Sequence, residues 1–123
     1  MPFRTVEHEG FVEFVATGRV TERELLESIQ SQTEGRADMR ELWNFSAADI
    51  TTLDARRFQE TARAAVSMGN VRPAGARTAL LMGNREDVLL AKAFAAWSEM
   101  NADRPMEAFD DRGAALAWLL DGR

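Results

Sequence analysis

Two segments of the chain, Glu41–Phe45 and Thr78–Met82, are largely apolar, and they constrain the fold more than any other feature. A strand with apolar residues on both faces must be covered on both sides, as the inner strands of a parallel sheet are. Each segment is followed by a stretch with helical periodicity, Asp54–Met68 after the first and Asn84–Met100 after the second. This pattern predicts alternating strands and helices, with the two apolar strands in the interior of a sheet.

Three further strands complete the predicted sheet. Phe3–Glu7 and Phe11–Thr17 are predicted strands, the second of them with good alternation, and Glu9-Gly10 between them predicts an opening β-hairpin. Met106–Phe109 is the fifth strand. Ser46–Leu53, after the third strand, is predicted to be a polar loop.

Helix starts are marked by polar caps. Thr21 and Glu24 form a capping box before a helix that ends ahead of Gly35, and Asn84 is placed to cap the third helix. Asp110 or Asp111 caps the last helix. Two apolar stripes are predicted to face inward: Leu90, Ala93, Phe94, Trp97 and Met100 in the third helix, and Ala115, Leu116, Leu119 and Leu120 in the last.

The predicted order of elements is β-β-α-β-α-β-α-β-α. Strands joined through helices pair in parallel with right-handed crossovers, while the opening hairpin is antiparallel. The sequence therefore predicts a single α/β domain over residues 1–123, with a mixed five-stranded sheet covered by about four helices.

Composition excludes several classes of function. The chain has no cysteine and one histidine, His8, so thiol catalysis, disulfides and a His- or Cys-based metal site are not expected. A net charge of −5 disfavours nucleic-acid binding, and no apolar run reaches the ~20 residues of a membrane span. We expect a cytoplasmic protein with no cofactor and no catalytic set of residues. His8, between Glu7 and Glu9, is either a solvated turn residue or a general base or pH switch.

Several motifs give the chain a resemblance to a known family. They are Gly18-Arg19-Val20-Thr21 before the first helix, Leu42-Trp43-Asn44-Phe45 in the third strand, Ala79-Leu80-Leu81-Met82 in the fourth, and Phe109-Asp110-Asp111 followed by Ala115-Leu116-Ala117-Trp118-Leu119 at the end. In these motifs the chain resembles the stage II sporulation AA-like (SpoIIAA-like) group, relatives of the STAS domain of anti-sigma factor antagonists. The resemblance covers nearly the whole chain and implies that fold.

The resemblance also implies a function, namely a non-enzymatic regulatory or protein-interaction module. STAS antagonists carry a phosphorylatable serine at the start of the helix after the third strand. The hydroxyls of that region here are Ser46, Thr51 and Thr52, which become the candidate regulatory residues. A domain that binds a small apolar or lipid-like ligand is the alternative, and an enzyme of unknown class is a second alternative.

The third predicted helix has more apolar surface than one core stripe requires. Val88, Leu89 and Leu90 are consecutive, and at ~100° per residue they cannot all point inward. Excess apolar surface that is contiguous marks a partner or ligand site. We therefore predict a homodimer contact, or the wall of an apolar pocket, formed by Leu89, Phe94, Ala96, Trp97 and Met100.

Overall fold

The computed structural model describes residues 3–33, 40–53, 56–57, 60–61, 63, 76–102 and 105–121, with side chains for all of these except 32–33 and 97–102. Within this part the chain forms five strands and three helices. The strands are β1 (Phe3–His8), β2 (Phe11–Arg19), β3 (Arg40–Asp49), β4 (Arg77–Leu81) and β5 (Met106–Phe109). The helices are α1 (Glu22–Thr33), α3 (Arg85–Ala102) and α4 (Arg112–Asp121).

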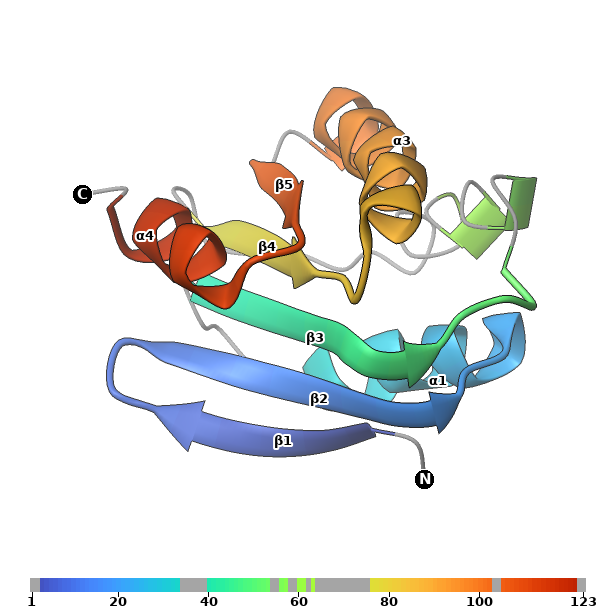
Figure 1. Ribbon diagram of the computed structural model, residues 1–123, viewed down its shortest axis with the longest axis horizontal. Helices are drawn as coiled ribbons and strands as arrows, with labels where there is room; N and C mark the ends of the chain where they lie inside the picture. The colour runs from blue at the N-terminus through green and yellow to red at the C-terminus, as the bar shows by residue number, and fades with distance from the viewer. Residues whose placement is uncertain are drawn as a thin grey trace.

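The strands form one mixed sheet in the order β1-β2-β3-β4-β5 (Figure 1). β1 and β2 pair antiparallel as a hairpin, whereas β2, β3, β4 and β5 pair parallel. The hairpin turn holds Gly10 at a φ of 89°, a left-handed conformation that glycine adopts without a Cβ clash. The predicted mixed sheet is confirmed, and the two apolar segments lie inside it.

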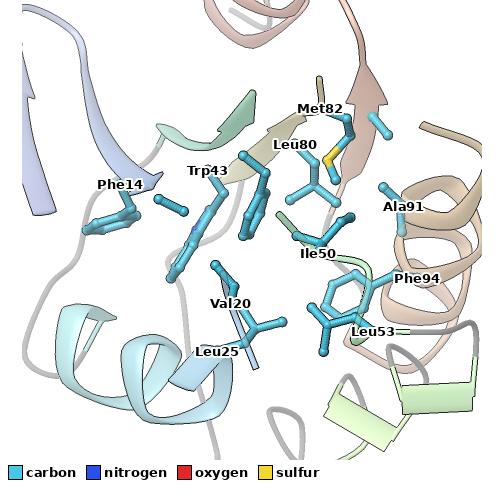
Figure 2. Close-up of a cluster of buried hydrophobic side chains, with 14 of the residues drawn as sticks. Phe14, Val20, Leu25, Trp43, Ile50, Leu53, Leu80, Met82, Ala91 and Phe94 are labelled. Carbon is cyan, nitrogen blue, oxygen red and sulfur yellow. The ribbon is translucent and has the colours of Figure 1, made fainter. Parts of the chain in front are cut away.

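Helices cover the two faces of the sheet unequally. The connecting helices α1 and α3 bury the larger core, in which Leu25 of α1 and Phe94 of α3 pack around Trp43 and Leu80 (Figure 2). On the opposite face α4 buries a smaller core. That core consists of Leu42, Ala79, Leu81, Ala115 and Leu119. Parallel strands added in one direction by right-handed crossovers place their connecting helices on one face, which is where α1 and α3 lie.

The predictions for individual helices are confirmed in part. Ala115 and Leu119 of α4 are buried as predicted, but Leu116 is half-buried and Leu120 is exposed. The predicted helix over Asp54–Met68 lies mostly outside the described residues. Its described members at 56–57, 60–61 and 63 are helical. The predicted burial of Trp43 and Phe94 is confirmed, while the Trp97 side chain lies outside the described part.

The third strand is longer than predicted. Ser46 to Asp49 belong to β3, where the sequence predicted a polar loop. β2 also continues to Arg19, and the two strands pair through Thr17↔Ala47 and Arg19↔Asp49 after a register shift. The loop prediction for these residues was wrong because ladder hydrogen bonds come from the backbone and do not depend on apolar side chains.

The predicted helix caps are confirmed by hydrogen bonds. Thr21 and Glu24 exchange the two bonds of a capping box, at 3.2 Å and 3.0 Å. The Asn84 side chain accepts from the amide of Asp87 at 2.9 Å. Of the two aspartates before α4, Asp111 is the cap, and it accepts from the amide of Ala114 at 2.8 Å.

The inward face of α3 differs from the predicted stripe. Val88, Ala91, Phe94 and Ala95 are buried, whereas Ala93 is exposed and Leu90 is half-buried. Apolar residues recur at helical spacing on two sides of this helix, so periodicity alone does not choose between the stripes. Packing against β5 and the larger core determines which stripe is buried, and it leaves the side that carries Leu89 in solvent.

Candidate functional site

A buried carboxylate is the most unusual polar feature of the described structure. Strand alternation places Glu13 on the α4 side of β2, in register with Leu42 of β3. The residue is 4% exposed, although it belongs to the second strand of the opening hairpin. A buried charge is costly unless it is paired and hydrogen-bonded, so its partners define the site.

Glu13 is held by residues from three other elements. Arg112 of α4 donates to both of its oxygens, at 2.8 Å and 2.9 Å, in the two-pronged geometry that arginine makes with carboxylates. Asn44 of β3 donates to Oε2 at 2.8 Å, and His8 of β1 lies 2.7 Å from Oε1. We call His8, Glu13, Asn44 and Arg112 the Glu13 network.

These contacts keep Glu13 ionised. The hydrogen bonds from Arg112 are the largest cause that lowers the pKa of Glu13, from an ordinary 4.5 to about 2. Burial opposes this shift, and the bonds from Asn44 and His8 add to it. A carboxylate with so low a pKa does not take up a proton near neutral pH, so the network is suited to holding elements together rather than to general base catalysis.

His8 is exposed at the end of β1, beside the hairpin turn, as the first of the two interpretations expected, but its side chain has specific partners. Its ring stacks on Phe11, with the centroids 4.4 Å apart, and its Nε2 faces Glu13 rather than its chain neighbours Glu7 and Glu9. The sequence interpretation overlooked Glu13 because it reads as the polar member of an alternating strand. Its position between Phe11 and Val15, on the same face of the strand, was the signal in the sequence that could have indicated its burial.

Ser46 extends the network toward solvent. Its hydroxyl and its amide both donate to Oδ1 of Asn44, at 2.6 Å and 2.9 Å. Its backbone passes so close to Gly83 that a Cβ there would lie 2.9 Å from the carbonyl oxygen of Ser46. Ser46 is exposed, and it stands within β3 rather than at a helix entry.

The other two candidate hydroxyls lie apart from the network. Thr51 is exposed and its hydroxyl donates to Oδ1 of Asp49 at 2.6 Å. This bond is the largest cause that lowers the pKa of Asp49. Thr52 is half-buried and donates to the carbonyl of Val20 at 2.8 Å. The three hydroxyls therefore have different partners, and Ser46 alone of the three joins the network.

The predicted interaction surface on α3 divides between two faces. Leu89 is 64% exposed and Ala96 is exposed, whereas Phe94 is buried in the larger core. The side chains of Trp97 and Met100 lie outside the described part. Ala93 is also exposed and stands four residues after Leu89, on the same side of the helix. We call Leu89, Ala93 and Ala96 the α3 outer row.

The described residues contain neither a metal site nor a membrane-spanning helix. Within the described parts of the chain, no three His, Asp or Glu side chains gather closely enough to hold a metal ion. None of the helices in those parts is long and apolar enough to cross a membrane.

Comparison with known proteins supports the fold. No family model matches the sequence, and no curated protein matches it. The structure is similar to that of an uncharacterized protein of the DUF3478 family, with a SpoIIAA-like fold, from Shewanella loihica PV-4. The two are 15% identical, the match covers 95% of this chain and 91% of the other, and the TM-score is 0.51. The chain thus has the SpoIIAA-like α/β fold that its sequence motifs predicted.

Proposed function

We propose that the chain is a non-enzymatic protein-interaction module that pairs with a second copy of itself through the α3 outer row. The observation that carries this proposal is the 64% exposure of Leu89, on a helix whose opposite face is already buried. Contiguous exposed apolar surface marks partner sites. The small side chains of Ala93 and Ala96 let another helix approach closely, and twofold pairs are the commonest soluble assemblies.

The Glu13 network supports the non-enzymatic part of the proposal. An active site needs a group poised to exchange protons or to attack a substrate. Glu13 is saturated instead, since each of its oxygens has two hydrogen-bond partners. The SpoIIAA-like fold is compatible with a regulatory role of this kind.

Sedimentation of charge variants tests the pairing. Leu89→Glu and Ala96→Glu each place a carboxylate in the apolar contact, and each is expected to dissociate the dimer without unfolding the monomer. Leu120→Glu is the matched control, because Leu120 is also an exposed large apolar residue but lies on α4. A wild-type chain that sediments as a monomer at high concentration contradicts the proposal.

Native mass spectrometry distinguishes the pairing from the ligand alternative. A dimer without added mass supports the interaction module. A monomer that retains a small molecule after purification from the host instead supports an apolar or lipid-like ligand, with the α3 outer row as part of its wall.

For the regulatory role we propose Ser46 as the modified hydroxyl. Its partner is the neutral amide of Asn44, and the guanidinium of Arg112 belongs to the same network. A phosphate on Thr51 would meet the carboxylate of Asp49, and Thr52 is half-buried. Intact mass and peptide mapping of the protein from its own cells test this choice. Phosphate found on other residues, or on none under any growth condition, contradicts it.

A further inference from the structure

α4 differs from the other described helices in its place in the chain. α1 leads from β2 to β3, and α3 leads from β4 to β5, so neither can leave the sheet without pulling on a strand at each end. α4 follows β5 and does not join two strands of the sheet. Its connection to β5 consists of Asp110 and Asp111 (Figure 1). It can therefore separate from the sheet with every strand in place.

Charged contacts fasten both ends of α4. At its start, Arg112 forms the two-pronged pair with the buried Glu13. At its end, Arg77 donates to the carbonyl of Trp118 at 2.6 Å, and Arg40 donates to that of Leu119 at 3.1 Å. The guanidinium of Arg77 also lies 4.6 Å from the centre of the Trp118 ring.

Between these ends, the apolar contact is smaller than that of the opposite face. Only Ala115 and Leu119 of α4 are fully buried, against Leu42, Ala79 and Leu81 of the sheet, while the half-buried Leu116 and Trp118 pack at the margin of this core. A helix of 10 residues is also too short to persist in water by itself, since isolated helices below about 12–15 residues are marginal. Detachment and melting of α4 should therefore occur together.

We infer that α4 is a cover that opens as one unit about Asp110 and Asp111, and that the ion pair between Glu13 and Arg112 is the latch that keeps it closed. Opening uncovers the apolar strip of Leu42, Ala79 and Leu81 on β3 and β4. Local opening at energies below global unfolding is common for elements with few buried contacts. This inference is independent of the pairing proposed for α3, which lies on the opposite face.

Acid weakens the latch by protonating Glu13. The groups that face its carboxylate are Arg112 from α4, His8 from β1 and the neutral amide of Asn44 from β3. The ionised Glu13 carboxylate stabilises the closed cover fully above its ordinary pKa of 4.5. This stabilisation is lost as the pH falls toward its lowered pKa of about 2. The cover is expected to open more often across this range.

Hydrogen exchange of the full chain, followed by mass spectrometry, tests the inference at neutral pH. In the wild type, amides of α4 should exchange faster than those of β3 and β4. Glu13→Gln should speed exchange in α4 by about 10-fold to 100-fold, the range expected for losing a hydrogen bond to a charged group. Amides of α3 and the sheet that exchange only through global unfolding can speed up by the same factor, but they should remain slower than the amides of α4. Glu107→Gln is the control, because it removes an ion pair to Lys92 on α3 and should leave α4 unaffected.

Two results overturn the inference. One is wild-type exchange in α4 as slow as in β3 and β4. The other is a Glu13→Gln variant whose α4 amides exchange no faster than those of the wild type, because the ion pair would then not keep the helix closed. If Glu13→Gln fails to fold, Arg77→Gln tests the same cover from its other end, with the same two contradicting results.

Discussion

The two faces of the sheet are covered in different ways. Under α1 and α3, nineteen described residues form a continuous apolar core, whereas under α4 only five are buried. The second face instead carries the Glu13 network and two arginines that hold the end of α4. Apolar burial gives the first face its stability. The second combines a smaller apolar core with the ion pair between Glu13 and Arg112 and two bonds from arginines to carbonyls, and the ion pair makes it sensitive to pH.

The largest expected effect is a truncation in the larger core. Phe14 is fully buried and packs against Trp43, with ring centroids 4.6 Å apart. Phe14→Ala should lower the free energy of unfolding by about 3–5 kcal/mol, because it leaves a cavity that its neighbours cannot fill. Urea denaturation measures this. A loss below about 1 kcal/mol would mean that this face is not the stable one.

Removing the latch charge should cost less. Glu13→Gln keeps a side chain of the same size but leaves Arg112 without its ionic partner. The free energy of unfolding at neutral pH should fall by about 1.5–3 kcal/mol, as for a hydrogen bond to a charged group. The double variant with Arg112→Gln completes a thermodynamic cycle. Additive losses in that cycle would show that the two residues do not act as a pair.

The helix caps should contribute about equally on both faces. Asn84→Ala removes the cap of α3 and Asp111→Ala removes that of α4, each bonded to an amide three residues on. Each change should cost about 1 kcal/mol by chemical denaturation. A much larger loss for Asp111→Ala would show that the cap itself, rather than the Glu13 pair, holds α4 in place.

The smallest effect is expected at the surface. Glu107→Gln breaks the ion pair between Lys92 and Glu107, whose side chains are 50% and 40% exposed. Water and salt already screen such a pair, so the loss should stay below about 1 kcal/mol. A loss as large as that of Glu13→Gln would show that burial of the Glu13 carboxylate does not strengthen its ion pair.

The sequence predicted the sheet, the caps and the hairpin because each depends on local patterns. Helical and strand periodicity, the capping box and the Glu9-Gly10 turn can be recognised in the sequence without knowledge of tertiary contacts. Glu13 was not predicted, because its partners are contributed by residues up to 99 positions away. The sequence predicted that Leu89 lies on an exposed side of α3. It wrongly assigned Phe94 to the same interaction surface, because apolar residues recur on two sides of that helix.

Acid denaturation of the wild type and of Glu13→Gln most directly tests whether the ion pair between the buried Glu13 carboxylate and Arg112 stabilises the α4 face. Other carboxylates titrate in both proteins, so the difference between the two isolates Glu13. The wild type should be more stable at neutral pH, and its advantage should disappear as the pH falls from about 4.5 to about 2. An advantage that is absent at neutral pH, or that persists unchanged at pH 2, would contradict this account.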